Sequence, residues 1–564
     1  MTTQTNLEIA ATARRRVLIV GGVAGGASTA ARLRRLDEDA EIVIFERGQH
    51  VSFANCGLPY HVGNVIPDEA SLLVASRELF RDRFAVEVFT EHEVTSIDRA
   101  CQTLRVRDLK TGLERDERWD ALVLAPGAAP LRPPLPGLEL PGVFTVKTIP
   151  DTRRIRAFLD DKPRAHATVV GGGFIGLEMA ENLVERGLQV TLIEKLPQVM
   201  PPLDADMAGF VALHLRQRGV DVRLSTGLAG VEARGERLAV HTDAATDIVR
   251  DVDTDLVILA LGVRPEVTLA REAGLTIGAR GGIVVDEQLR TSDPSILAVG
   301  DAIEVKDIVS GAEQVLPLAG PANRQGRVAA ATLAGKHAAF RGVQGTAVVG
   351  VLGLTVATTG QSEKALTRAG RRDYHVVELH PGHHASYYPG AKALHLKLIF
   401  DTRGAILGAQ AVGTEGVDKR IDVIATALQL GADVRQLAGL ELCYAPQFGA
   451  AKDPVNVAGM MAVNVLEGQM PLADWDRLDE PGHLLLDVRE PREFARGHIP
   501  GATNLPLSEL RARLDEIPRD QPVWLCCAVG QRAYFAQRQL LQHGIDARNL
   551  SGGYATWQAR RAAA

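Results

Sequence analysis

The sequence is poor in cysteine and in aromatic residues, and it has no long apolar run. Its 564 residues include five cysteines, an odd number without framework spacing, which argues against structural disulfides and permits reactive thiols. No apolar segment approaches the roughly 20 residues of a membrane-spanning helix, and Arg14–Arg16 is followed by only four apolar residues, too few for a signal peptide. With 46% apolar and 4% aromatic residues, the composition predicts a soluble, cytoplasmic α/β protein.

The charge balance argues against a general nucleic-acid-binding protein, because the formal net charge is −6 at pH 7. The length of the chain predicts three or four domains. We assign no metal site.

A glycine-rich turn follows the first apolar segment. Residues 16–20 predict a short buried strand, and residues 21–26 (GGVAGG) predict a turn into a helix whose first amides could hold a pyrophosphate. A second strand, residues 41–45, ends in Glu46, where a carboxylate would bind a ribose diol. Val23 replaces the middle glycine of the usual pattern, so this turn alone is a weak signal. The cofactor ligands expected here are Gly21, Gly22, Gly25, Gly26, Glu46 and Arg47.

A second copy of this pattern strengthens the first. Residues 167–170 and 190–194 predict two strands around a turn with all three glycines in register, Gly171, Gly173 and Gly176. Two such units predict two dinucleotides, FAD in the first and a nicotinamide cofactor in the second. Glu194 favours NADH because a carboxylate repels a 2′-phosphate, while NADPH stays possible.

Two further segments support a flavin. Residues 122–127 end a strand in a turn at Gly127, and residues 291–301 end a strand in Gly300-Asp301. The second segment resembles the FAD-contacting motif of two-dinucleotide flavoprotein reductases, in which the aspartate binds the ribityl chain. The alternative is an acidic residue that caps a helix.

Cys56 is the most informative single residue. It lies in residues 52–60 (SFANCGLPY), just beyond the first dinucleotide unit, and no second cysteine follows at close spacing. A dithiol reductase would store two electrons as an internal disulfide, whereas a single thiol must pair with an external sulfur, its substrate. We expect Cys56 to open a helix near the flavin ring, where it would be held as a thiolate. The alternative is a buried, inert cysteine.

The C-terminal part contains a second reactive cysteine. Residues 484–490, 493–502, 523–532 and 551–554 together resemble a single rhodanese domain. Its reactive loop would run from Cys527 to Arg532, and six residues favour sulfur transfer because related phosphatases have one residue more. We expect Cys526 to be a packing residue, and Asp487 and Arg489 to form a structural ion pair.

These motifs predict an α/β protein with a two-dinucleotide-binding flavoprotein disulfide reductase fold, followed by an α/β rhodanese domain. It would have FAD and NAD Rossmann-like domains and an α+β dimerisation domain. We expect the FAD domain at 14–126 and 275–340, the NAD(P)H domain at 127–274, the dimerisation domain at 345–465, a linker at 464–475 and the rhodanese domain at 475–560.

Three stretches resemble the coenzyme A-disulfide reductases. They are residues 22–28 with 32–37, residues 52–60, and residues 444–448 with 452–456. With the rhodanese tail, nearly the whole chain after residue 14 resembles the fused coenzyme A-disulfide reductase–rhodanese proteins, which are NADH-dependent persulfide reductases. The resemblance implies a homodimer that uses FAD and NADH to reduce coenzyme A disulfide, coenzyme A persulfide or polysulfide.

The resemblance also implies roles for individual residues. Cys56 would form a mixed disulfide with coenzyme A, assisted by Tyr387 and Tyr444 of the partner subunit, with Tyr388 as the alternative to the first tyrosine. Cys527 would collect sulfane sulfur in a loop that Arg532 closes. The residues expected to bind substrate are Ser28, Arg32, Arg35, Ser52, Asn55, Asn323 and Lys452. For Arg32, Arg35 and Lys452, the alternative to phosphate binding is that they are solvated surface charges.

One residue departs from the family pattern, and two alternative functions stay open. Phe84 stands where a family lysine is expected, which leaves one phosphate contact unassigned. An NADH oxidase or peroxidase would cycle through a cysteine sulfenic acid, but such enzymes commonly have a histidine in the first glycine turn, where this chain has Ala24. A sulfur-carrier or sensor protein is the third possibility.

Overall fold

The computed structural model describes residues 14–243 and 251–562, which form two compact units. The first unit comprises the described chain up to Leu131, together with Lys147–Arg154 and Gly262–Val343. The second comprises Arg132–Val146, Ile155–Leu261 and the described chain from Gln344 onward. The predicted fold class is confirmed, whereas the limits of the four expected domains stay a prediction.

A five-stranded parallel sheet forms the core of the first unit. Its order is β19 (Ile296–Ala298), β7 (Ala121–Leu124), β1 (Arg16–Val20), β2 (Glu41–Glu46) and β3 (Val86–Thr90). Apolar side chains of β1 and β7 are buried, as expected for a parallel sheet covered on both faces. The predicted strands at 16–20 and 41–45 are confirmed.

Helices α1 (Ala24–Arg34) and α8 (Ala319–Leu333) pack against each other beside this sheet. Helix α1 begins three residues before the expected position, directly after Val23. The remaining elements of the unit are α2 (Leu58–Val62), α3 (Arg77–Phe84), α7 (Thr268–Glu272), β4 (His92–Asp98), β5 (Thr103–Asp108), β6 (Glu114–Arg118), β8 (Ala128–Pro130), β17 (Val263–Pro265), β18 (Ile283–Val284), β20 (Ile303–Lys306) and β21 (Glu313–Gln314).

The second unit repeats the parallel sheet. The order is β12 (Asp221–Arg223), β11 (Gln189–Ile193), β10 (His166–Val170), β16 (Leu256–Leu259) and β9 (Val143–Phe144). Around it lie α4 (Ile149–Asp161, which begins in the first unit), α5 (Phe174–Glu185), α6 (Ala205–Gln217), β13 (Leu228–Arg234), β14 (Arg237–Thr242) and β15 (Asp251–Thr254). The predicted second dinucleotide unit is thus built on the same strand–turn–helix plan.

An antiparallel sheet follows in the same unit. Its order is β22 (Ala347–Val351), β23 (Leu354–Gly360), β26 (Ile406–Gly413), β25 (Leu394–Asp401) and β24 (Tyr374–Leu379). The helices of this part are α9 (Glu363–Arg368), α10 (Val417–Gln429), α11 (Val434–Ala438) and α12 (Pro454–Leu466). The sequence of this part predicts strands over 394–400 and 405–412 and a helix over 419–430, and β25, β26 and α10 agree with them within two residues.

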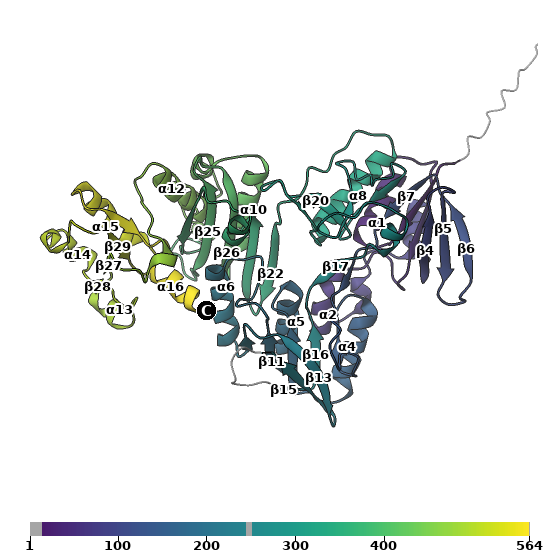
Figure 1. Ribbon diagram of the computed structural model, residues 1–564, viewed down its shortest axis with the longest axis horizontal. Coiled ribbons are helices and arrows are strands. Elements are labelled where there is room, and N and C mark those ends of the chain that lie inside the picture. Colours follow the sequence, from purple (N-terminus) through teal and green to yellow (C-terminus); the bar gives the residue numbers. More distant parts are fainter. Residues whose placement is uncertain (1–13, 244–250, 563–564) are drawn as a thin grey trace, which may run out of the picture. The chain divides into compact units, whose positions relative to one another are not determined.

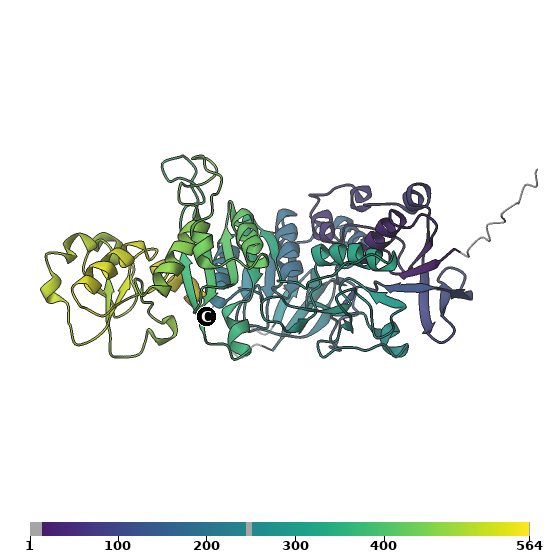
Figure 2. The same ribbon diagram turned by 90° about the horizontal axis from the view of Figure 1, so that it is seen from above.

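The C-terminal elements, coloured yellow, form a compact group next to the green strands of this antiparallel sheet (Figures 1 and 2). Their parallel sheet has the order β28 (Thr503–Asn504), β27 (Leu484–Asp487), β29 (Val523–Cys526) and β30 (Ala547–Asn549). The helices are α13 (Pro491–Ala495), α14 (Leu507–Leu510), α15 (Gln531–Gln542) and α16 (Gly553–Ala562). The expected linker at 464–475 is wrong at its start, since α12 continues to Leu466, and Leu472 pairs with Asn549.

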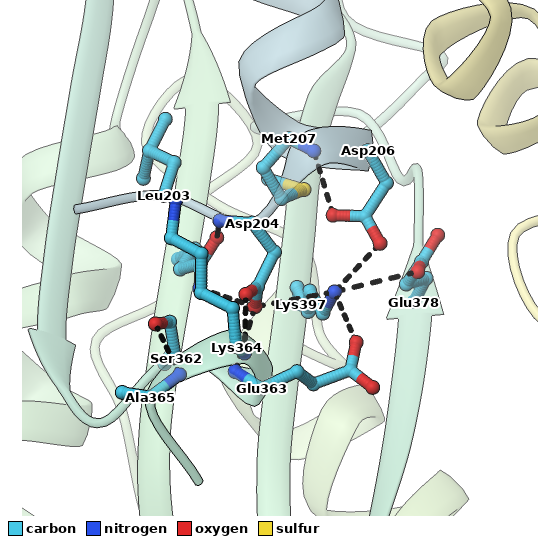
Figure 3. A network of polar contacts seen from close by, with 12 residues as sticks. Leu203, Asp204, Asp206, Met207, Ser362, Glu363, Lys364, Ala365, Glu378 and Lys397 are labelled. Carbon is cyan, nitrogen blue, oxygen red and sulfur yellow. Dashed lines mark hydrogen bonds and ion pairs between the residues drawn. The ribbon is translucent and has the colours of Figure 1, made fainter. Parts of the chain in front are cut away.

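A buried charge cluster joins three parts of the second unit (Figure 3). Lys397 on β25 has no exposed side-chain surface, and its ammonium lies 2.6 Å from Asp206, 3.3 Å from Asp204 and 2.5 Å from Glu363. Burial alone would lower the pKa of Lys397, but these carboxylates outweigh it and raise the pKa well above its usual range. The cluster therefore fixes the start of α6 to the antiparallel sheet.

Helix α16 joins the same cluster through Glu378 on β24. Burial and the neighbouring Asp206 raise the pKa of Glu378, and the Thr556 hydroxyl of α16 donates a hydrogen bond to its carboxyl group. The Ser551 hydroxyl accepts the N–H of Glu378 at 2.8 Å. The C-terminal segment is thereby attached to the antiparallel sheet by buried polar contacts.

Candidate functional site

The first glycine turn has no room for side chains. Gly21 has φ +94°, and a methyl group there would overlap the Ala125 carbonyl, while one at Gly26 would overlap the Gly21 carbonyl. The Glu46 carboxylate accepts the N–H groups of Gly22 at 2.8 Å and Gly48 at 2.6 Å. The turn and the acidic residue predicted to bind a dinucleotide therefore lie side by side. Arg47, also assigned to this cofactor, is exposed and pairs with Glu93 at 3.8 Å.

The second turn repeats this geometry. Gly171 has φ +110°, and a methyl group at Gly176 would overlap the Gly171 carbonyl. The buried Glu194 carboxylate accepts the N–H groups of Gly172 at 2.7 Å and Leu196 at 2.8 Å. Among the described residues, apart from its chain neighbours, no atom lies within 4 Å of the Cβ position of Gly173, which leaves open space where a pyrophosphate would approach. Two turns with one geometry support the assignment of both, including the first with its Val23.

The Gly-Asp motif lies at the end of β19. Gly300 has φ +85° and donates its N–H to the Gln325 side chain at 2.7 Å. Burial raises the pKa of the neighbouring Asp301. Gly127, at the end of the other flavin segment, has φ +74° and open space at its Cβ position. Sequence reasoning missed Gln325, since nothing local marks a glutamine on α8 as a partner of this turn.

Cys56 lies on a 3-10 turn, Asn55–Gly57, and is exposed. Cys56 is expected to open a helix, and the structure places it in this 3-10 turn, which is followed directly by the five-residue α2 beginning at Leu58. The backbone of Ser52 connects this segment to the first glycine turn, since its N–H donates to the Gly22 carbonyl at 2.8 Å. The segment that carries Cys56 is therefore attached through Ser52 to the proposed cofactor turn, and Cys56 is not buried.

Two buried polar atoms lack hydrogen-bond partners among the described residues. They are Asn55 Oδ1, next to Cys56, and Arg32 Nε on α1. Buried polar atoms are normally paired, so these two fit groups that a bound cofactor or substrate would supply. The Ser28 hydroxyl on α1, another residue expected to bind substrate, donates a hydrogen bond to the Asn323 side chain on α8 at 2.5 Å.

The expected anion-binding cations differ in burial. The sequence predicts a first helix over residues 27–36, with Arg32 and Arg35 on one face. Arg35 is exposed and lies one residue beyond the end of α1, although its φ of −73° keeps it close to helical geometry. Arg34 between the two candidates is buried and donates to backbone carbonyls, including Phe84 and Ala40, so its role is structural. Lys452 is exposed, just before α12.

The two tyrosines assigned to the site lie together. The hydroxyl groups of Tyr387 and Tyr444 are 2.6 Å apart, and this hydrogen bond raises the pKa of Tyr387. Their exposed fractions are 73% and 48%. Tyr388 instead packs edge-on against His384, with ring centroids 5.6 Å apart. The geometry favours Tyr387 over Tyr388 as the partner of Tyr444.

The C-terminal reactive loop joins β29 to α15. The Tyr554 N–H donates to the Cys527 carbonyl at 2.8 Å, and the Asn549 amide donates to the Gly530 carbonyl at 3.2 Å. Both Cys527 and Cys526 are buried, and the Cys526 thiol donates to the Cys527 carbonyl. The loop is thus held at both ends.

Ion pairs surround this loop. Arg532 forms two hydrogen bonds with Glu493, of 2.6 and 2.7 Å, which lower the pKa of Glu493 to about 2. The predicted structural pair is confirmed, with Arg489 Nη2 2.6 Å from Asp487 Oδ2. Sequence reasoning missed Glu493. Its only local signal is the spacing from Glu490, which forms a capping box at α13.

Comparisons with known families agree with this geometry. The family model for pyridine nucleotide-disulphide oxidoreductases matches residues 15–338, and the model for their dimerisation domain matches residues 346–454. The chain belongs to the pyridine nucleotide-disulphide oxidoreductases. The model for rhodanese-like domains matches residues 474–560.

Several relatives of this oxidoreductase cover it well. Coenzyme A disulfide reductase of Staphylococcus haemolyticus is 36% identical over 79% of this chain and 99% of the relative. NADH oxidase of Methanocaldococcus jannaschii is 35% identical over 80% of this chain and 100% of the relative.

Two solved structures resemble it over nearly the full length. Reduced Bacillus anthracis CoADR-RHD has a TM-score of 0.94 and 46% identity, covering 97% of this chain and 98% of that one. The NAD-dependent persulfide reductase from A. fulgidus has a TM-score of 0.89 and 38% identity, covering 96% and 100%. This chain is thus an FAD-dependent oxidoreductase with a C-terminal rhodanese-like domain. In residues 14–243 and 251–562, no helix is long and apolar enough to cross a membrane.

Proposed function

We propose that this chain reduces coenzyme A disulfide, coenzyme A persulfide or polysulfide with NADH, through Cys56 as its single redox cysteine. The observation that carries the proposal is the exposed Cys56, four residues after Ser52, whose backbone N–H donates to the Gly22 carbonyl of the first glycine turn. Asn55 beside it has a buried oxygen without a partner in the described chain. The names of the relatives supply the substrate class.

The chemistry assigned to Cys56 is nucleophilic. Its thiolate attacks one sulfur of the substrate disulfide, forms a mixed disulfide with coenzyme A, and expels the second sulfur as a thiolate. For a persulfide, sulfide leaves first. FAD, when bound, relays the two electrons of NADH to the mixed disulfide. Cys56 is then regenerated and the second coenzyme A thiol is released.

We assign Tyr387 and Tyr444 to protonation of the departing thiolate. Their paired hydroxyls are exposed, so they can reach a sulfur outside their own domain. We place them in the site of the partner subunit of a homodimer, as the dimerisation domain suggests. In addition, Phe448 is 67% exposed on the same loop as Tyr444 and would be covered by such a partner.

Coenzyme A carries three phosphates, which need cations. We assign Arg32, Arg35 and Lys452 to them, with Ser28, Ser52, Asn55 and Asn323 as polar contacts. Arg32 is the strongest of the three cations, because its Nε is buried without a partner among the described residues. We further propose that Cys527 collects sulfane sulfur as a persulfide and passes it to coenzyme A or toward Cys56.

A parallel assay tests this function. NADH oxidation is followed with coenzyme A disulfide, hydrogen peroxide and oxygen as separate acceptors. We expect coenzyme A disulfide to be reduced at least about tenfold faster in kcat/KM than peroxide or oxygen. The NADH oxidase among the relatives makes oxygen a serious competitor, although Ala24 replaces the histidine expected of such enzymes. Faster turnover with oxygen or peroxide would overturn the reductase proposal.

A further inference from the structure

One buried arginine lies at the base of the two tyrosine-bearing segments. Arg420 on α10 is 1% exposed. Its Nη2 donates to the His383 carbonyl at 2.8 Å and to the Asp453 carboxylate at 2.9 Å, and its Nη1 donates to the Gly416 carbonyl at 3.1 Å. A single guanidinium therefore joins three separate segments.

The bonded groups lie close in sequence to the two tyrosines. His383 precedes Tyr387 by four residues, and Asp453 follows Tyr444 by nine. Asp453 also accepts the N–H of Val455 at 3.0 Å, which fixes it as the N-cap of α12. Arg420 thus links the chain before Tyr387 to the chain after Tyr444.

Backbone hydrogen bonds add a second link between the same segments. The Gly449 N–H donates to the carbonyl of Ala445, the residue after Tyr444, at 3.1 Å. The Gly449 carbonyl accepts the N–H of Ala385, two residues before Tyr387, at 2.8 Å. Gly449 therefore connects the two loops directly, in the stretch between Tyr444 and Asp453.

The tyrosines themselves lie outside helices and strands and are largely exposed. Exposed loops are mobile unless buried contacts fix their backbone, because ordering each residue costs conformational entropy. The 2.6 Å separation of the Tyr387 and Tyr444 hydroxyls consequently depends on what fixes the loops. Arg420, buried and bonded to both sides, is the side chain placed to do so.

We infer that Arg420, together with Asp453, is a positioning residue for the Tyr387–Tyr444 pair. It holds the two hydroxyls at hydrogen-bonding distance so that they can protonate a leaving thiolate together. This inference rests on the proposed function of the tyrosines and adds the group that orders them.

The substitution Arg420→Lys tests it while keeping the positive charge. A lysine ammonium cannot reproduce the planar fork that reaches three acceptors. We expect coenzyme A disulfide turnover to fall at least about tenfold, to the level of Tyr444→Phe. The rate at which NADH reduces the bound flavin without disulfide should not change, because that step does not need the tyrosines.

A double variant separates positioning from general damage. If Arg420 acts through the pair, Arg420→Lys with Tyr444→Phe should be no slower than Tyr444→Phe alone. Arg371→Lys is the matched control, since it alters another arginine–aspartate pair, with Asp401 at 3.3 Å, at the opposite end of β24 and β25 from the Tyr387 loop, and it should leave disulfide turnover unchanged. Asp453→Asn is a milder second variant that keeps the helix cap, and it should show the same selective loss.

The outcomes distinguish the positioning role of Arg420 from the proposed catalytic role of the two tyrosines. Full coenzyme A disulfide turnover by Tyr444→Phe would overturn the proposed role of the tyrosines. A defect in Tyr444→Phe with normal turnover in Arg420→Lys and Asp453→Asn would overturn the positioning role alone. So would a double variant in which the two losses multiply.

Discussion

At the residue scale, a carboxylate accepts backbone N–H groups at each glycine turn, and a guanidinium forms an ion pair at the end of the Cys527–Arg532 loop. Glu46 and Glu194 each accept two backbone N–H groups beside a turn, which fixes an acidic side chain where each cofactor ribose is expected. Arg532 is in turn held by Glu493. Each glycine turn is thus held by one carboxylate, whereas the Cys527–Arg532 loop is linked at its last residue to α13 through Glu493.

The loop cysteine gives a prediction at this scale. With polysulfide as the sulfur donor, Cys527→Ser should lower NADH oxidation at least about tenfold, because no persulfide can form on the loop. Reduction of coenzyme A disulfide should be retained, since it needs only Cys56. Steady-state assays with the two substrates check this, with Cys101→Ser, an exposed cysteine between β4 and β5, as control. Unchanged polysulfide turnover would rule out a role of Cys527 in sulfur supply.

Residues with local signals could be predicted, and residues with distant partners could not. Cys56, the glycines and the Cys527–Arg532 loop follow from short motifs. Glu493 acts through a residue 39 positions away, and Arg420 through Asp453, 33 positions away. No periodicity or spacing encodes such pairs, because they form only when separate elements pack together.

At the element scale, the closest packing in the first unit is between α1 and α8. Gly326 on α8 faces α1, and a methyl group there would lie 2.7 Å from the Gly25 carbonyl oxygen and 2.8 Å from Ser28 Cβ. Since α1 also carries the first glycine turn, its position bears directly on cofactor binding.

Substituting this glycine tests the packing. Gly326→Ala should destabilise the protein by about 1–3 kcal/mol and lower its FAD content, because α1 must move. Gly320→Ala on the same helix is the control, because nothing lies within 4 Å of its Cβ position, and it should be neutral or slightly stabilising. Thermal unfolding and flavin absorbance measure both effects. Equal behaviour of the two variants would show that the close approach is unimportant.

The elements themselves were largely predictable. Short apolar runs next to glycine turns located β1, β2, β10 and β11 within a residue or two. The helix ends were predicted less accurately, since α1 begins at Ala24 and not at residue 27, and α12 extends into the expected linker. Neither limit has a strong capping signal on its own, and tertiary packing decides where the helix stops.

At the scale of the whole molecule, a buried charge cluster links α6 to the antiparallel sheet (Figure 3), and Thr556 of α16 donates a hydrogen bond to its Glu378. Two histidines lie in the same region: His395 Nδ1 is 2.9 Å from His380 Nδ1, and His380 Nε2 is 2.9 Å from the Thr556 hydroxyl. Burial lowers the pKa of His380 to about 3 and that of His395 to about 4.

These histidines predict a loss of stability in mild acid. The folded state keeps both neutral, while the unfolded chain binds protons below its ordinary pKa of about 6.5, so stability falls as the pH drops through the window from about 6.5 to 4. Each histidine should cost about 2 kcal/mol between pH 7 and 5. Urea unfolding followed by tryptophan fluorescence measures this, since Trp475, Trp524 and Trp557 lie in the C-terminal segment.

A variant isolates the histidine contribution. His395→Gln should show a smaller difference in unfolding free energy between pH 7 and 5 than the unchanged protein, whereas His543→Gln, an exposed control, should not. An identical pH dependence in all three proteins would exclude the buried histidines as its source.

The most direct test of the proposed chemistry is mass spectrometry of the Cys56 peptide after the enzyme has reacted with coenzyme A disulfide without NADH. We predict a disulfide-linked coenzyme A on Cys56, absent from Cys101 and Cys443 and removed when NADH is added. An unmodified Cys56, or one carrying only oxygen, would contradict the assignment of this thiol as the site of disulfide exchange.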